Sequence, residues 1–191
     1  MRIVGGSARG TALATPKSDR TRPTSDQVRE ALFNILEHSV ADFSLQGARV
    51  LDLFAGTGAL GLEALSRGAG FTVFIDEDAS ARGIIRDNIM RTHMTGKSRI
   101  SRRDAARLGP VGKHEPFDLV FADPPYRKGL GAAAIASALA GGWLKPGALV
   151  VVEDTKGTVF AWPEGVEAVD ERGYGETVVR IGARHIDNFR E

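Results

Sequence analysis

The sequence predicts an α/β fold in which helices cover both faces of a mainly parallel, doubly wound sheet. From residue 47 onward, short apolar runs alternate with segments of helical periodicity, and the connections between them are short. The first apolar run is followed by a glycine-rich segment and then by a helix. Folds of this class bind their ligands beyond the carboxyl ends of the strands, where such a loop lies.

The expected strands and helices follow in chain order. Parallel strands are predicted over residues 49–53, 72–76, 98–101, 117–122 and 148–153. Helices are predicted over residues 59–67, 79–92 and 130–140. Two further apolar runs, 166–169 and 177–181, have no long helix between them, so we expect an antiparallel hairpin at one edge of the sheet.

Residues 1–40 are predicted to form an extension that packs on a domain spanning residues 41–191. Residues 1–16 contain β-like pieces separated by glycines, which indicates a hairpin or an extended arm. A helix is expected over residues 24–38, beginning with a capping box of Thr24 and Gln27. Its apolar side chains share one face, so we expect this helix to pack against the rest of the protein.

The composition excludes several kinds of site. The chain has 191 residues, enough for one well-buried domain, and it contains no cysteine. Disulfides, thiolate catalysis and cysteine-bound metals are therefore excluded. The four histidines lack the spacing of metal ligands, so no metal is expected. No apolar run approaches the roughly 20 residues that span a membrane, and no signal-peptide core is present, which favours a cytoplasmic location.

The net charge of +1 is unevenly distributed along the chain. Residues 1–29 hold six basic and two acidic side chains, a net charge of +4, which leaves −3 for the remainder. A basic arm of this kind is suited to binding a polyanion. The alternative is a solvated and partly mobile N-terminus.

A glycine loop follows the first predicted strand. Its residues with expected cofactor contacts are Asp52, Phe54, Gly56, Thr57 and Gly58. Together with Gly61, the glycines fit the spacing G-x-G-x-x-G, which by itself is a weak signal for a dinucleotide. The carboxylate of Asp52 would repel a pyrophosphate, however, and favours a cationic ligand. S-adenosylmethionine, which carries a sulfonium and an ammonium group, is such a ligand.

Two further acids are expected to bind the adenosine part of the cofactor. Asp76 ends the second strand, where a carboxylate can accept hydrogen bonds from both ribose hydroxyls. Asp104 follows the third strand and can accept from the adenine amino group. Alternatively, Asp76 caps a helix, and Asp104 pairs with Arg102 or Arg103.

The segment Asp123-Pro124-Pro125-Tyr126 directly follows the buried strand 117–122. Proline has no N–H and a fixed φ, so the segment forms a stiff rim whose carbonyls remain free to accept hydrogen bonds. A carboxylate and a carbonyl together suit a planar amino group, and the tyrosine face suits a planar ring. The alternative is a proline-capped strand end with Tyr126 packed locally.

With these motifs in this order, the chain resembles class I S-adenosylmethionine-dependent methyltransferases that modify amino groups. The Asp-Pro-Pro-Tyr form is shared by enzymes acting on adenine N6, cytosine N4 and guanine N2. Three other segments resemble the bacterial RsmD family in particular: Met1–Gly10, Thr21–Leu36 and Tyr174–Thr177.

The resemblance implies a seven-stranded Rossmann-like sheet whose last strand is antiparallel. It also implies methyl transfer from S-adenosylmethionine to N2 of one guanine in 16S rRNA, the guanine(966)-N(2) type of reaction. The RNA would be part of the small ribosomal subunit or its assembly intermediate. We expect a monomer that needs neither a metal nor a membrane. Relatives often carry glutamate where this chain has Asp76.

For this reaction, we expect the Asp123 carboxylate and the Pro124 carbonyl to accept the two N2 hydrogens while Tyr126 stacks on the base. Arg22 could instead cap or pack against the helix over residues 24–38. The basic side chains expected to hold the flanking phosphates are Arg9, Arg20, Arg22 and Lys128.

Other functions stay open from the sequence alone. The nearest is an amino-methyltransferase acting on adenine N6 or cytosine N4 of RNA or DNA. A protein glutamine methyltransferase usually has asparagine where this chain has Asp123. A nicotinamide-dependent oxidoreductase would use the same glycine spacing, and an RNA-binding module without turnover could keep the same fold.

Overall fold

The computed structural model describes residues 1–17, 25–125 and 129–186. The helices are α1 (Asp26–His38), α2 (Ala59–Ser66), α3 (Ala79–Arg91) and α4 (Leu130–Ala140). The strands are β1 (Arg49–Leu53), β2 (Phe71–Ile75), β3 (Ser98–Ser101), β4 (Phe117–Ala122), β5 (Leu144–Thr155), β6 (Val166–Tyr174) and β7 (Thr177–Arg184). Short 3₁₀ helices cover Thr95–Lys97 and Ala105–Arg107.

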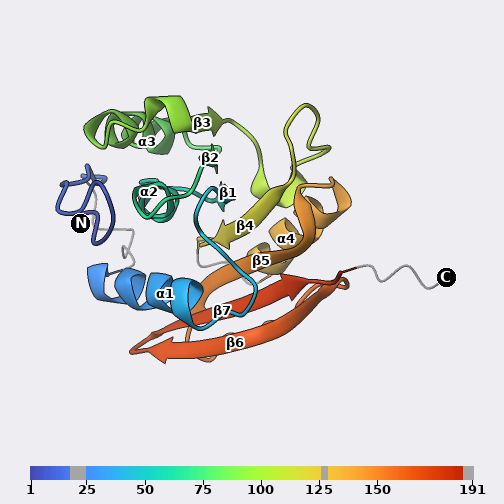
Figure 1. Ribbon diagram of the computed structural model, residues 1–191. Helices are drawn as coiled ribbons and strands as arrows, with labels where there is room; N and C mark the ends of the chain where they lie inside the picture. Colours follow the sequence, from blue (N-terminus) through green and yellow to red (C-terminus); the bar gives the residue numbers. More distant parts are fainter. Residues whose placement is uncertain (18–24, 126–128, 187–191) are drawn as a thin grey trace.

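The seven strands form one sheet in the order β3-β2-β1-β4-β5-β7-β6. Strands β1 to β5 pair in parallel, whereas β7 runs antiparallel to both of its neighbours. The predicted fold class and the antiparallel hairpin are therefore confirmed (Figure 1). The hairpin strands are longer than the sequence indicated, because alternating polar residues continue both strands past their apolar parts.

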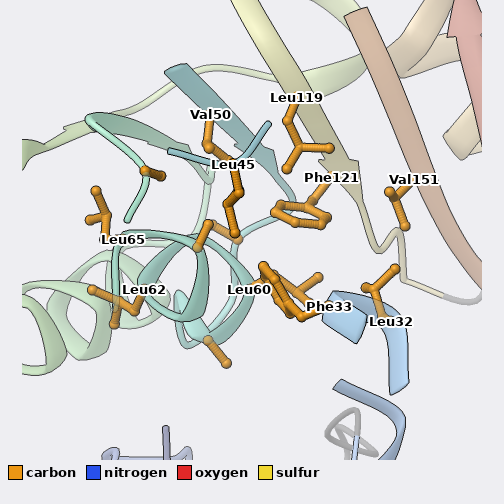
Figure 2. Packing of buried hydrophobic residues seen from close by; sticks show 14 of the residues in the cluster. Leu32, Phe33, Leu45, Val50, Leu60, Leu62, Leu65, Leu119, Phe121 and Val151 are labelled. Carbon is orange, nitrogen blue, oxygen red and sulfur yellow. The ribbon is translucent and has the colours of Figure 1, made fainter. Parts of the chain in front are cut away.

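Two clusters of buried side chains fill the two faces of the sheet. One cluster lies between the sheet and helices α1, α2 and α3, and the other lies beneath α4. In the first, Phe33 of α1 packs on Phe121 of β4 with ring centroids 5.7 Å apart (Figure 2). Because the strands are covered on both faces, their carboxyl ends are held at one rigid edge.

The crevice at this edge lies between β1 and β4. The chain moves outward from β1 to β2 and β3, and then returns to the other side of β1 to form β4. Ligands of doubly wound sheets bind at such a switch point in strand order. The fold therefore places the segments that follow β1, β2, β4 and β5 at one edge of the sheet.

Helix α1 begins two residues later than predicted. Ser25 is its N-cap, and the Ser25 hydroxyl accepts a hydrogen bond from the Val28 amide at 3.1 Å. The capping box of Thr24 and Gln27 was therefore wrong. Serine and threonine are both favourable N-caps, so residue type alone does not distinguish Thr24 from its neighbour Ser25.

The N-terminal residues form a hairpin packed along α2, in which Arg2 and Ala12 make an antiparallel bridge. Ile3 and Leu13 are buried in the core, so the alternative of a solvated, mobile N-terminus is wrong for this part of the chain. The carboxylate of Glu63 on α2 accepts hydrogen bonds from the amides of Val4 (2.9 Å) and Gly5 (2.8 Å). This carboxylate anchors the hairpin to α2.

Glu63 also joins two buried or nearly buried arginines. Its side chain is fully buried and lies 2.8 Å from Arg67 and 3.5 Å from Arg29, which is itself fully buried in α1. One carboxylate thus connects the hairpin, α1 and α2.

Among the described residues, no helix is long and apolar enough to cross a membrane.

We predict that Glu63→Ala lowers the free energy of unfolding by about 3–5 kcal/mol, because it removes the carboxylate partner of two arginines in a buried network. Chemical denaturation measures the change. The control is Glu115→Ala, whose carboxylate is exposed and lies 3.9 Å from Arg49. That variant should change stability by no more than about 0.5 kcal/mol. Equal effects of the two variants would contradict this role of Glu63.

Candidate active site

The loop after β1 turns sharply at the carboxyl edge of the sheet. Gly56 and Gly58 have φ values of 57° and 77°, and Phe54 adopts a φ of 54° although it has a bulky side chain. This left-handed conformation is rare for such residues and is often found at functional sites. The loop leads directly into α2, whose N-cap is Gly58.

Asp76 holds this loop in place. One of its carboxylate oxygens accepts from the Gly56 amide at 2.9 Å, and the other accepts from the Asp78 amide at 2.9 Å. The N-cap of α3 is Asp78, which accepts from Ser80 and Ala81, so the alternative that Asp76 caps this helix is wrong. Asp76 therefore connects the loop after β1 with the end of β2.

A cavity of about 540 Å³ opens at this point. Three residues predicted to bind the cofactor, Phe54, Asp76 and Asp104, line it together. Pro125 and Leu130 line it as well, although the sequence analysis gave them no such role. The cavity is within the size range of small-molecule sites, and it brings polar acceptors and apolar walls together.

Asp104 accepts a hydrogen bond from the Ala106 amide at 2.8 Å and so caps the 3₁₀ helix that follows β3. Arg103 donates instead to the carbonyls of Leu108 and Pro110. The alternative pairing of Asp104 with Arg103 is therefore not what the structure shows. The cap fixes the Asp104 carboxylate at the wall of the cavity.

Asp52 lies beneath the loop and is almost completely buried. Its carboxylate accepts from the Gly61 amide at 3.0 Å. Burial raises the pKa of Asp52 to about 8, and the negative charge of Asp76 adds to this effect. At neutral pH the site therefore contains an acid that would become fully charged only in the presence of a positive charge or further donors.

Gly61 has a packing role. A Cβ atom at this position would lie 2.5 Å from a ring carbon of Phe74 and 2.7 Å from the Thr72 methyl group. Because glycine has no Cβ atom, α2 approaches β1 and β2 closely enough for the Gly61 amide to reach Asp52. The third glycine of the spacing G-x-G-x-x-G thus serves helix packing, which its sequence pattern could not distinguish from ligand binding.

Asp123 follows β4 at the centre of the carboxyl edge and is partly buried. Burial raises its pKa well above the usual value, and the negative charges of Glu153, Asp52 and Asp154 raise it further. Three neighbouring acids therefore raise the pKa of Asp123, the acid that the sequence analysis expects to contact the reacting amino group. Such perturbed groups in a crevice are typical of functional sites.

The prolines after Asp123 lie between two cavities. Pro125 lines the cavity over β1 to β3, and both Pro124 and Pro125 line a second cavity of about 440 Å³ beside β5. The second cavity is also lined by Asp154 and Phe160. The rim formed by Pro124 and Pro125 therefore has a cavity on each side.

The remaining predicted residues are placed only in part. Tyr126, Lys128, Arg20 and Arg22 lie outside the described residues. Arg9 is exposed at the tip of the N-terminal hairpin, where the neighbouring Ala8 amide donates to the Ser66 hydroxyl. Ser66 ends α2, and α2 begins at the glycine loop, so roughly 12 Å of helix separates this tip from the loop.

Asn88 of α3 is a supporting residue that the sequence analysis missed. It is fully buried, and its side chain exchanges hydrogen bonds with the backbone of Ala14 at 2.7 and 3.0 Å. Its amide also donates to the Thr57 carbonyl at 2.9 Å. An asparagine on the buried face of a helix, between Ile85 and Ile89, was the available signal.

The arrangement provides carboxylate and carbonyl hydrogen-bond acceptors. Within residues 1–17, 25–125 and 129–186, no group of three or more metal-ligating side chains could hold a metal ion. The carboxylates and the rim carbonyls can accept hydrogen bonds from amino and hydroxyl groups and can stabilise positive charge. Together, fold and site define the chain as a class I methyltransferase with a Rossmann-like sheet.

Comparison with known proteins identifies the family. The family model Conserved hypothetical protein 95 matches residues 1–183, and the chain belongs to this family, which comprises RsmD-type methyltransferases. The protein named Ribosomal RNA small subunit methyltransferase D from Escherichia coli is 41% identical over 153 residues, which are 80% of this chain and 74% of that protein. Its namesake from Haemophilus influenzae is 32% identical over 183 residues, 95% and 92% of the two chains.

A solved structure agrees with these sequence matches. The structure of the protein yhhF from Escherichia coli aligns with this chain at a TM-score of 0.81 and 34% sequence identity. The alignment covers 98% of this chain and 99% of the yhhF chain. The similarity therefore includes the N-terminal hairpin and the antiparallel edge of the sheet, as well as the central strands.

We predict that Asp52→Asn stabilises the protein increasingly as the pH rises from about 4 to about 8. The raised pKa means that folded Asp52 retains a proton which the unfolded chain has lost in this window. Wild-type stability therefore falls with rising pH by at most about 1.4 kcal/mol per pH unit from this group. Thermal unfolding of both proteins across this range measures the difference. Parallel curves of Tm against pH would contradict the assignment.

Proposed function

We propose that this protein transfers a methyl group from S-adenosylmethionine to the exocyclic N2 of one guanine in 16S rRNA. The observation that carries the proposal is that Asp123 and Pro124 directly precede Pro125, which lines the same cavity as Asp76 and Asp104. The substrate is supported by the names of the relatives, which are ribosomal RNA small subunit methyltransferases. The guanine(966)-N(2) reaction fits the resemblance of the N-terminal segments to RsmD enzymes.

The cavity over β1 to β3 fits the adenosine part of the cofactor. The Asp76 carboxylate at its wall can accept from the ribose hydroxyls, and Asp104 can accept from the adenine amino group. Phe54 and Leu130 supply apolar surface for the ring. The buried Asp52 suits a cationic group better than a pyrophosphate, since its charged form requires a compensating charge. Gly56, Thr57 and Gly58 let the backbone approach the ligand.

When bound, S-adenosylmethionine supplies an electrophilic methyl group, which leaves a neutral thioether behind. The residues of the chain hold and polarise the acceptor. Asp123 and the Pro124 carbonyl accept hydrogen bonds from the two N2 hydrogens, which directs the nitrogen lone pair toward the methyl group and offsets the positive charge that develops on nitrogen. The methylated nitrogen then releases one of these protons, for which the Asp123 carboxylate, with its raised pKa, is the acceptor. Holding the reacting atoms in this orientation contributes roughly 7–11 kcal/mol in favourable cases.

The RNA must present its guanine outside any stack or pair. Extruding the base costs a few kcal/mol, which contacts to the flanking nucleotides offset. Tyr126 stacks on the base in this proposal, and Arg9, Arg20, Arg22 and Lys128 are the candidate phosphate contacts. The enzyme acts as a monomer in the cytoplasm on the small ribosomal subunit or its assembly intermediate, and needs no metal.

We predict that Asp123→Ala lowers the rate of methyl transfer to small ribosomal subunits by at least about 100-fold, because a preorganised acceptor at the reacting nitrogen is lost. Binding of S-adenosylmethionine, measured by calorimetry, should change little. Asp118→Asn, at the opposite end of β4, serves as the control and should keep its activity. Full activity of Asp123→Ala would contradict the mechanism.

A second prediction concerns the cofactor. Asp76→Ala should weaken S-adenosylmethionine binding roughly 10- to 100-fold, since hydrogen bonds from two hydroxyls to a charged acceptor are lost. Asp76→Glu keeps the carboxylate and should keep most of the affinity. The wild-type protein should not bind NAD under the same conditions. Tight binding of NAD would instead favour the oxidoreductase reading of the glycine loop.

A further inference from the structure

We propose that the RNA substrate docks, through its phosphates, on the surface formed by residues 79–113 at one edge of the sheet. These residues form α3, β3 and the two short 3₁₀ helices, and we call the surface the α3–β3 face. The inference rests on the proposed function and adds to it. The basic residues named there belong to the N-terminal segment and to the segment after β4.

The α3–β3 face carries more positive charge than the N-terminal segment does. Residues 79–113 hold nine basic and two acidic side chains, a net charge of +7, whereas residues 1–29 have a net charge of +4. A polyanion is the kind of partner that such a surface fits. Seven of the nine basic side chains are exposed: Arg86, Arg91, Lys97, Arg99, Arg102, Arg107 and Lys113.

The protein does not neutralise these charges. Among the described residues, none of the nine basic side chains forms an ion pair with a carboxylate. Arg82 and Arg103 donate to backbone carbonyls, which leave the positive charge in place. By contrast, Arg67 and Arg180 each contact two acids. A solvated surface of mixed charge would contain such pairs, so the single sign of the α3–β3 face favours a role in binding.

A neighbouring histidine responds to this charge. Burial lowers the pKa of His114, and the positive charges of Arg99, Arg49 and Arg103 lower it further. The Arg103 guanidinium also lies over the Trp143 ring, 5.2 Å from its centroid, which holds this cation at the surface of the sheet. Several cations therefore act on one place, and the phosphates of a polyanion would offset their repulsion.

The opposite edge of the sheet has the opposite charge. The strand order puts β3 at one edge and β6 at the other, as Figure 1 shows. Residues 164–176, which include β6, hold five acidic side chains and one basic side chain, a net charge of −4. Phosphates are therefore attracted to the α3–β3 face and repelled from the β6 edge. This difference orients the enzyme on RNA before any base is contacted.

The α3–β3 face borders the proposed cofactor site. Arg103 and Arg107 line the cavity of about 540 Å³, and Pro125 lines the same cavity. Pro125 comes two residues after Asp123, the proposed contact of the reacting amino group. RNA held on the α3–β3 face therefore lies beside the carboxyl edge of the sheet. A base extruded from it can enter the site while the flanking phosphates stay on the face.

The residue types fit phosphate recognition. Seven of the nine basic side chains are arginines, whose planar guanidinium can donate two parallel hydrogen bonds to one phosphate. Such contacts strengthen binding but carry no sequence information. The α3–β3 face should therefore set the affinity for RNA, while the choice of the methylated nucleotide belongs to the site after β4.

The test compares two double variants that each remove two exposed positive charges. Arg86→Gln/Arg102→Gln changes the α3–β3 face, and Lys156→Gln/Arg172→Gln changes the opposite side of the sheet. Binding of naked 16S rRNA, and of small subunits from cells that lack this protein, is measured over a series of salt concentrations. Glutamine keeps a long polar side chain, so both variants should fold as the wild-type protein does.

The Arg86→Gln/Arg102→Gln variant should raise the Kd for RNA by at least about tenfold. The slope of log Kd against log salt concentration should decrease by roughly one to two, because each lost phosphate contact removes about 0.7 to 0.9 from it. In methyl transfer, KM for the small subunit should rise while kcat stays unchanged. Lys156→Gln/Arg172→Gln should leave the Kd and the slope unchanged.

An unchanged slope in Arg86→Gln/Arg102→Gln would overturn the inference. Equal changes in the two double variants would overturn it as well, because net charge alone would then explain them. Poly-glutamate is the probe for an acidic protein partner, and binding as tight as that of RNA would also contradict the inference. If the slope decreased as expected but the wild-type enzyme methylated no RNA, the proposed function would fail while the docking surface would stand.

Discussion

The position of acids at the carboxyl edge of one parallel sheet is the constraint on which the site depends. Asp52, Asp123 and Glu153 belong to three adjacent strands or their immediate extensions, and all three face the same side. Parallel pairing fixes their spacing, and Asp52, the most buried of the three, is the least screened by water. Burial is the main reason why the pKa values of Asp52 and Asp123 are raised, and the negative charges of neighbouring acids raise them further.

The raised pKa values of Asp52 and Asp123 suit a ligand that carries positive charge or N–H donors. A cationic group near Asp52 and amino hydrogens near Asp123 would each favour the charged carboxylate. In the proposed function, the same electrostatics that reduce stability would favour binding of a sulfonium cofactor and of a base with N–H donors. Stability at this edge comes from elsewhere, chiefly from the core beneath α1 and α2 (Figure 2).

The N-terminal hairpin is connected to the glycine loop through buried side chains of α2 and α3. Glu63 attaches the hairpin to α1 and α2, and Asn88 connects Ala14 of the hairpin with Thr57 of the glycine loop. The positive charge of this region suggested an RNA-binding arm, but the part that the structure describes is packed against the domain. RNA contact by its basic side chains stays a prediction, and the outward tip with Arg9 lies at the far end of α2.

The sequence predicted most of the fold because its strands are short apolar runs separated by glycines, acids and prolines. It also predicted that Phe54, Asp76 and Asp104 act together, and these residues line one cavity. It could not show that Asp52 is buried under Gly61, since that depends on how closely α2 packs on β1 and β2. The role of Asn88 depends on contacts between distant segments, which no local pattern contains.

The most direct test of the account is transfer of labelled methyl groups from S-adenosylmethionine to small ribosomal subunits from cells that lack this protein. Naked 16S rRNA and DNA would be treated in parallel, and the labelled product would be digested to nucleosides. The account predicts N2-methylguanosine at one site of 16S rRNA. Label on adenine or cytosine, or label on DNA alone, would contradict it.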